Sequence, residues 1–175
     1  MLPSVRKNPI AGSPFCGFTC PMTVIVDPDD GTRLPGSFEV VVKVRGEDTG
    51  GALAVIEETV PPGAFITPHT HENDVWVHVL SGEVGVLVGD SIGTASAGAW
   101  ALKPRGVVHA MWNAASEPAR IIEVLTPGGT ERWFEETAAL EPGDRAGFDD
   151  ASRRYGITFL PDSPWTATIR ERFGL

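Results

Sequence analysis

The sequence predicts one all-β domain, an antiparallel sandwich or barrel, from three observations. β-branched and aromatic residues gather in eight short runs between residues 37 and 127. Turns rich in Gly and Pro separate these runs, which is typical of short antiparallel strands. No alternation of strands with helices occurs there, so a parallel α/β sheet is not expected. With 175 residues, the chain is long enough to bury its own core.

The elements follow in order along the chain. Residues 1–36 are rich in Pro and Gly and predict an irregular N-terminal arm. Residues 37–127 form the predicted barrel, with strands at SFEVVVKVR, ALAVIEETV, FITPHTH, VWVHVL, EVGVLVG, WALK, VVHAMWN and ARIIEVLT. Residues 128–175 predict a C-terminal extension packed on the barrel. It has one or two short helices, TERWFEETAAL and DDASRRYG, the second with an Asp cap and a stop at Gly156.

Charge and hydropathy limit the classes of partner. The chain has 23 acidic and 14 basic residues, a formal charge of -9 and no Lys/Arg-rich run, so nucleic-acid binding is not expected. No run of about 18 apolar residues is present to span a membrane, and the N-terminus lacks the apolar core of a signal peptide. We expect a cytoplasmic protein with a small-molecule ligand.

Cys16 and Cys20 are the only cysteines. They could form a redox pair or half of a zinc site, or they could be two small apolar side chains in a loop. We favour the loop, because a structural zinc site needs about four ligands and no other cysteine is present.

Three of the four histidines have spacings typical of a metal site. Residues two apart on a strand point to the same face, so His69 and His71 can present both imidazoles to one ion. The sequence before His109 predicts a strand and a Pro-Gly turn, and the return strand can bring a third imidazole to this pair. Imidazole suits zinc, iron, nickel and copper.

Two stretches resemble the motifs of the cupin superfamily. The first motif has the form Gly, five residues, His-x-His, three or four residues, Glu, six residues, Gly; the second has Gly, five residues, Pro-x-Gly, two residues, His, three residues, Asn. The chain matches both, except at the Glu, with Gly63, His69, His71, Gly82, Gly98, Pro104, Gly106, His109 and Asn113. The wider stretch is similar to small single-domain cupins of the quercetin dioxygenase type.

This resemblance implies a cupin double-stranded β-helix, or jelly-roll barrel. It implies that His69, His71 and His109 are ligands of one divalent transition metal, such as Fe, Ni, Zn or Cu. It also implies a homodimer, because cupins commonly associate through the outer face of one sheet.

The cupin glutamate falls on Val75, which cannot be a ligand, and three interpretations stay open. Three histidines could hold the ion and favour an anionic ligand that supplies the missing negative charge. A different acid could substitute, either Glu57 or Glu58 on a neighbouring strand, or Asp74 or Glu72 nearby; Asp74 would need a β-bulge because its parity is opposite. Alternatively, the barrel has lost its metal and only encloses a ligand.

Strand parity predicts the wall of the barrel. Val75, Val77 and Val79 share one face of their strand, and Met111 and Asn113 share the face of His109. Such an apolar wall suits a small hydrophobic or aromatic molecule. The residues predicted to contact it are Val75, Val77, Met111, Asn113 and Phe65.

Other aromatic and charged residues are expected outside this wall. His78, Trp76 and Trp112 have outward parity, which places the tryptophans against a second layer, the arm or another subunit. Trp133 and Phe134 could cap the barrel mouth or form a dimer contact, but we favour simple packing against the sandwich. Arg105 is expected to be a solvated residue of the hairpin turn.

Taken together, these features predict a mononuclear metal-binding protein, with a dioxygenase-like enzyme as the leading hypothesis. Its substrate would be a small hydrophobic or aromatic compound that ligates the metal as an anion. The alternatives are a redox-inert zinc isomerase or cyclase, and a non-catalytic cupin that binds a small molecule, because one fold hosts many activities.

Overall fold

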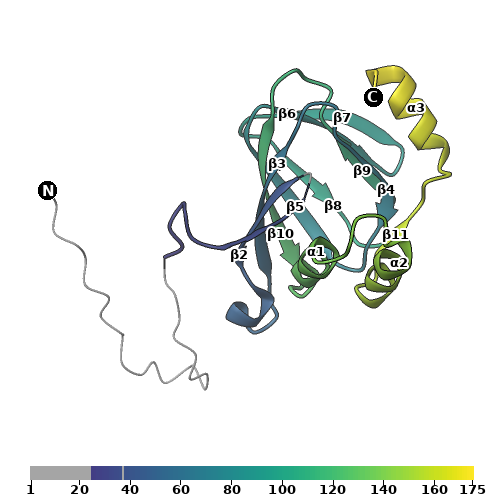
Figure 1. Ribbon diagram of the computed structural model, residues 1–175. Coiled ribbons are helices and arrows are strands. Elements are labelled where there is room, and N and C mark those ends of the chain that lie inside the picture. Colours follow the sequence, from purple (N-terminus) through teal and green to yellow (C-terminus); the bar gives the residue numbers. More distant parts are fainter. Residues whose placement is uncertain (1–24, 37) are drawn as a thin grey trace, which may run out of the picture.

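The structure is a computed structural model that describes residues 25–36 and 38–175 (Figure 1). The predictions for Cys16 and Cys20, and for most of the N-terminal arm, lie outside the described residues.

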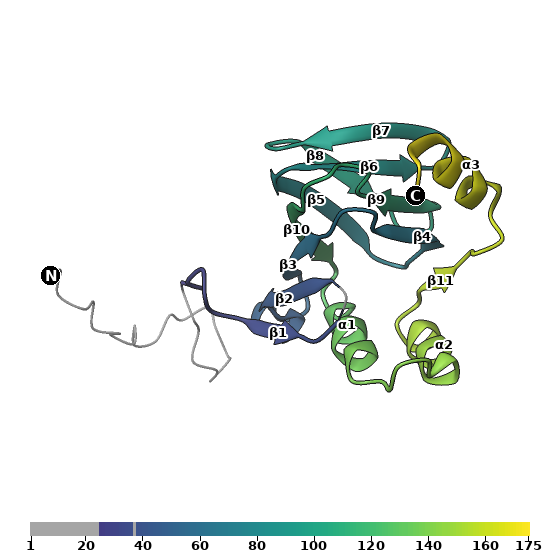
Figure 2. The ribbon, with the colours of Figure 1, turned by 45° about the horizontal axis from the view of Figure 1, so that its top comes forward.

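Two antiparallel sheets face each other and form the walls of a barrel (Figures 1 and 2). The larger sheet has the order β1-β2-β3-β10-β5-β8, with β1 Thr32–Leu34, β2 Glu39–Val44, β3 Ala54–Val60, β10 Ala119–Thr126, β5 Asp74–Ser81 and β8 Trp100–Lys103. The smaller sheet has the order β11-β4-β9-β6-β7, with β11 Thr158–Phe159, β4 Phe65–Thr70, β9 His109–Trp112, β6 Glu83–Val88 and β7 Ser91–Ser96. This architecture is a double-stranded β-helix, as predicted.

The core lies between the sheets, and the alternation of the sequence determines which residues reach it. Along β5, Val75, Val77 and Val79 are buried. Their partners on β10 include Ile121 and Leu125, which are also buried. Because successive side chains of a strand point to opposite faces, this period of two gives each sheet one apolar face.

All eight predicted strands are present, and three further strands were missed. β7 was interpreted as part of a turn, because its sequence, SIGTAS, is small and polar; it is an edge strand that pairs with β6 along its whole length. β1 lies within the expected arm, so the sheet begins before residue 37. β11 lies within the expected helical extension and adds an edge to β4.

The C-terminal extension contains three helices: α1 Glu131–Ala138, α2 Arg145–Arg154 and α3 Pro164–Phe173. The first two were predicted, although α2 begins earlier than expected, because its capping residue is Asp144, which accepts a hydrogen bond from the Gly147 amide. Gly156 follows the end of α2 with φ of +66°, consistent with its predicted role as a stop. No helix in the described part of the chain is long and apolar enough to cross a bilayer.

α3 was not predicted, and it covers the outer face of the smaller sheet (Figure 2). Its Ile169 packs with Trp112, Leu87 and Ala110 in a second apolar cluster, where Trp112 is 1% exposed. The outward parity predicted for Trp112 is therefore confirmed, and the second layer that covers it is α3.

The outer face of the larger sheet exposes three large apolar side chains near its β8 edge. Trp76 on β5 and Trp100 on β8 are 43% and 57% exposed, and Leu80 lies on the same face. His78 stacks on Trp100 with ring centroids 4.3 Å apart. His78 and Trp76 thus point away from the barrel interior, as predicted.

Candidate metal centre

The structure brings together the three predicted histidines. His69 lies near the end of β4 and His109 begins β9, and the two residues are partners in the ladder between these strands. His71 follows β4 directly, on the same side as His69. One ring nitrogen from each histidine lies within 4.8 Å of the others, and all three residues are buried.

Hydrogen bonds orient each imidazole toward this common point. Nδ1 of His69, His71 and His109 lies 2.7–2.8 Å from a backbone carbonyl oxygen, that of Thr67, Asn73 and Val107 respectively. A carbonyl only accepts, so each Nδ1 donates and each neutral ring keeps an unprotonated Nε2.

The three Nε2 atoms fit a metal ion. Nε2 of His69 lies 3.0 Å from Nε2 of His109, although neither carries a proton to donate. Nε2 of His71 is buried and has no hydrogen-bond partner among the described residues. Buried polar atoms are normally satisfied, so a cation between these lone pairs is the arrangement that the donor set suits.

The environment keeps the histidines neutral. Burial, followed by the positive charge of Lys103, lowers the pKa of His69 to about 3. Burial, followed by the neighbouring His69, lowers the pKa of His109 to about 2. The pKa of His71 is also lowered, mainly by burial. Because a metal binds the neutral imidazole, little proton competition is expected near pH 7.

Val75 is 1% exposed and points to the barrel interior. Its neighbours in the ladders are Lys103 on β8 and Leu125 on β10.

The acids predicted as substitutes for the cupin glutamate have different partners. Glu57 forms an ion pair with Arg120. The Asp74 carboxylate accepts hydrogen bonds from Arg105, and these lower the pKa of Asp74 to about 2. Arg105, expected to be a solvated residue of the turn, therefore pairs with this carboxylate. Among the acids predicted as substitutes, Glu58 is the one that lines the cavity.

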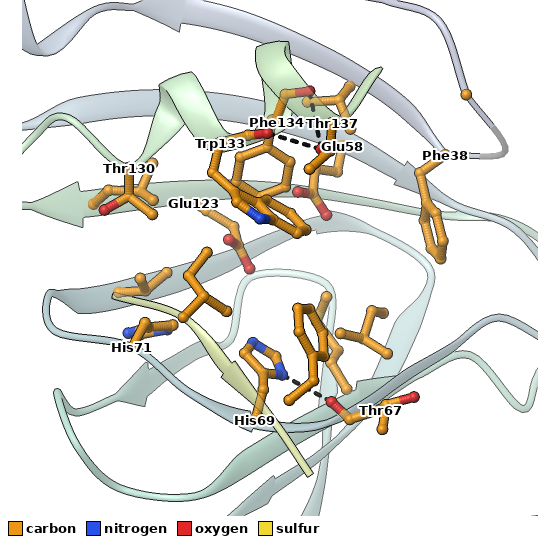
Figure 3. A pocket seen from close by; sticks show the side chains of 18 of the residues that line it. Phe38, Glu58, Thr67, His69, His71, Glu123, Thr130, Trp133, Phe134 and Thr137 are labelled. Carbon is orange, nitrogen blue, oxygen red and sulfur yellow. Dashed lines mark hydrogen bonds between the residues drawn. The ribbon is translucent and has the colours of Figure 1, made fainter. Parts of the chain in front are cut away.

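The histidines open onto a cavity of about 440 Å³ between the two sheets (Figure 3). Val75, Met111 and Phe65, three of the residues predicted to contact a ligand, line it. Val77 is a fully buried core residue and Asn113 holds a turn: its amide donates to the carbonyls of Val60 and Glu117. Neither of the two is among the residues that line the cavity in the described chain. Parity placed them on the inner face but could not say how deep they lie.

The C-terminal extension closes one side of this cavity with aromatic side chains. Trp133 and Phe134 come from α1, and Figure 3 shows both facing the cavity. Phe148 from α2 and Phe159 from β11 also line it. Phe159 stacks on His69 with ring centroids 5.2 Å apart. Trp133 and Phe134 thus line the mouth of the barrel, and Phe134 also packs against its core, so the predicted packing and the predicted cap occur together.

The cavity contains three buried charged residues, of which Glu58 was a predicted candidate and Glu123 and Lys103 were missed. Glu58, Glu123 and Lys103 are each 4–5% exposed, and Lys103 donates a hydrogen bond to Glu123. Burial, followed by the negative charge of Glu123, raises the pKa of Glu58 to about 8. Parity offered a signal for Glu123, because it shares its strand face with Ile121 and Leu125.

Comparison with known proteins agrees with this geometry. Residues 56–125 match the family model described as the cupin domain. This stretch carries the cupin pattern. The matched stretch contains all three histidines, together with Glu58, Lys103 and Glu123. Over this stretch the chain is similar to the cupin family, and its fold agrees with that similarity.

Solved structures are similar in fold. KdgF from Halomonas sp. is 18% identical with a TM-score of 0.51, over 59% of this chain and 90% of that chain. A predicted oxalate decarboxylase from Thermotoga maritima is 18% identical with a TM-score of 0.50, over 53% of this chain and 82% of that one. At this identity, the likeness concerns the fold alone. No curated protein matches the sequence.

Proposed function

We propose that the protein is a mononuclear metalloenzyme of dioxygenase type that acts on a small hydrophobic or aromatic compound. The observation that carries the proposal is the convergence of three unprotonated Nε2 atoms on the wall of a cavity lined by aromatic side chains. The residues would hold one divalent iron, nickel, copper or zinc ion. Bound there, such an ion would act as a Lewis acid on a substrate donor atom and, if redox-active, would support reaction with dioxygen.

Val75 defines the charge of the preferred substrate. In the cupin motif, this position holds a glutamate, and here it presents an apolar side chain to the cavity. Three neutral imidazoles leave the charge of the ion uncompensated, so an enolate, phenolate, carboxylate or thiolate is favoured. Phe159 and the aromatic residues of α1 would orient the apolar body of the substrate and exclude water.

Glu58, Lys103 and Glu123 favour a second candidate, a redox-inert isomerase or cyclase. They place proton-carrying groups in the same cavity as the histidines, which redox chemistry alone does not require. In this alternative, zinc polarises the substrate and the acidic groups move its protons.

Metal analysis and oxygen uptake test the proposal. The purified protein is analysed for metals, stripped, and reloaded separately with Fe(II), Ni(II), Cu(II) and Zn(II). Oxygen consumption is then followed with 3-hydroxyflavone, acetylacetone and 3-mercaptopropionate, which bind metals as an enolate, a diketonate and a thiolate. We expect one ion per chain, and uptake with a redox-active ion but not with zinc. Conversion without oxygen uptake would support the isomerase or cyclase, and failure to bind any ion would contradict both.

A further inference from the structure

The cavity carries a second polar cluster opposite the histidines. Glu58 on β3, Glu123 on β10 and Lys103 on β8 belong to the larger sheet, whereas His69 and His109 belong to the smaller one. Figure 3 shows the Glu58 and Glu123 carboxyl groups on one side of the cavity, with His69 and His71 on the other. A ligand that occupies the cavity therefore lies between two different polar walls.

The charges of this cluster leave Glu58 without a counterion. Lys103 is already paired with Glu123. Among residues 25–36 and 38–175, no side chain forms a hydrogen bond or an ion pair with Glu58. The residues beside it in the sheet are Val40 on β2 and Ile121 on β10, both buried and apolar.

An ionised Glu58 would therefore be a second buried carboxylate beside one ammonium, and an uncompensated buried charge is strongly unfavourable. The other titratable groups that line this cavity are Glu123, Lys103 and the three neutral histidines. Burial and the charge of Glu123 raise the pKa of Glu58 to about 8, which agrees with a neutral carboxyl group near pH 7.

We propose that Glu58 is a catalytic residue that donates a hydrogen bond, and during turnover a proton, to the end of the substrate opposite the metal. This inference rests on the proposed function and deepens it by naming the substrate class. The substrate has a metal-ligating oxygen or sulfur at one end, an apolar body, and a hydrogen-bond acceptor such as a carbonyl at the other. A neutral carboxylic acid in an apolar site is a known way to supply such a donor.

The residues of the cluster account for the proton that is transferred and for the negative charge that it leaves behind. The O–H bond of Glu58 breaks, a new bond forms between that proton and the substrate acceptor, and the electron pair stays on the Glu58 carboxylate. The charge of Lys103 stabilises that carboxylate, since the ammonium acts to lower the pKa of Glu58. Lys103 and Glu123 are thus positioning residues, and the step needs no oxidant.

Ligand binding to the zinc-loaded protein tests the hydrogen bond without relying on turnover. The probe is 4-nitrocatechol, which has metal-ligating oxygens at one end and an accepting nitro group at the other; 4-methylcatechol lacks this acceptor. The variants are Glu58→Gln, Glu58→Leu and, as a matched control on the opposite face of β3, Glu57→Gln. Affinities are measured by absorption between pH 6 and 9, and thermal unfolding checks that each variant is folded.

We expect Glu58→Leu to bind 4-nitrocatechol about three- to tenfold more weakly, the range of one hydrogen bond, and 4-methylcatechol as the wild type does. Wild type and Glu57→Gln should lose affinity for 4-nitrocatechol as the pH rises through about 8, relative to Glu58→Gln, whose amide still donates. Equal binding of 4-nitrocatechol by wild type and Glu58→Leu, or one pH profile for all variants, would overturn the inference.

A second measurement separates this inference from the metal chemistry. In the metal-free protein labelled with 13C at the glutamate carboxyl carbon, one resonance should titrate near pH 8, be missing from Glu58→Gln and persist in Glu57→Gln. If no such resonance exists, Glu58 is ionised at neutral pH and the inference fails, whatever the metal result. If it is present but zinc does not bind, the proposed function fails instead.

Discussion

Nε2 of His69 lies 3.0 Å from Nε2 of His109, while Nδ1 of each ring faces a backbone carbonyl oxygen. Two lone pairs at this distance repel one another unless a positive charge lies between them. The ladder between β4 and β9 holds both rings in this arrangement. The fold thus maintains a donor set that suits a bound cation.

Replacing either of these histidines should abolish stoichiometric metal binding. His69→Ala and His109→Ala each remove one of three ligands, and the two imidazoles that remain cannot fill a stable site. His78→Ala is the matched control, because His78 stacks on Trp100 outside the barrel. Elemental analysis after dialysis against zinc checks this. Unchanged metal content in His69→Ala would refute the assignment.

The stability of the metal-free protein should be greatest near pH 6.5. The pKa values of the three histidines are lower in the folded state, so their contribution is present above the ordinary value of 6.5 and is lost as the pH falls. Glu58 has the opposite sign, because its pKa is raised from 4.5 to about 8 and stability is lost as the pH rises through this range.

Each group changes the free energy of unfolding by up to about 1.4 kcal/mol per pH unit. Urea unfolding with a chelator present, at intervals from pH 5 to 8, measures the curve. His69→Asn should flatten its acidic side and Glu58→Gln its basic side. A curve unaffected by either variant would contradict the prediction.

Val75→Glu should tighten zinc binding. The new carboxylate would lie beside the histidines in the position of the cupin glutamate, and we expect a gain of about ten- to hundredfold, the range of a charge-assisted contact. Lys103, directly across the ladder, would compete for the carboxylate, so Val75→Glu with Lys103→Met should gain more. Val75→Gln is the neutral control. Competition with a chromophoric chelator measures the dissociation constants, and equal values would place position 75 away from the metal.

Lys103→Met should destabilise the protein by about 3–5 kcal/mol, because it leaves Glu123 buried without its partner. Changing Glu123 to Leu as well should restore much of this loss. Arg120→Met removes the exposed partner of Glu57 and should cost less than about 1 kcal/mol. Denaturant unfolding at pH 7 gives the free energy of unfolding of each variant. Similar losses for Lys103→Met and Arg120→Met would show that the buried pair contributes no more to stability than the exposed pair.

Gly85→Ala should disturb the packing beneath α3. A Cβ at residue 85 would lie 2.0 Å from Cε2 of Trp112, whose ring is buried. Such overpacking costs about 1–3 kcal/mol or more. Gly93→Ala, on the neighbouring strand, meets open space and should be neutral or stabilising by about 0.5–1 kcal/mol. Thermal unfolding and tryptophan emission compare the pair, and equal stability would contradict the described position of Trp112.

The sequence alone predicted eight of the strands and the pairing of His69 with His71, because both depend on local periodicity, whereas His109 was added by the resemblance to the cupin motifs. Side chains two apart on a strand share a face, and that rule placed His69 with His71 and directed Val75 inward. It also sent His78 and Trp76 outward, as found. β7 was missed because an edge strand of small polar residues carries no such pattern.

Only the tertiary structure decided what surrounds the histidines. Glu58, Lys103 and Glu123 lie on three different strands, and the order of those strands in the sheet brings them into one cavity. Phe159 reaches His69 because β11 returns to pair with β4, far along the chain from that strand. Periodicity assigns a side chain to a face, but it does not determine which distant segment covers that face, because this depends on the pairing and packing of the whole chain.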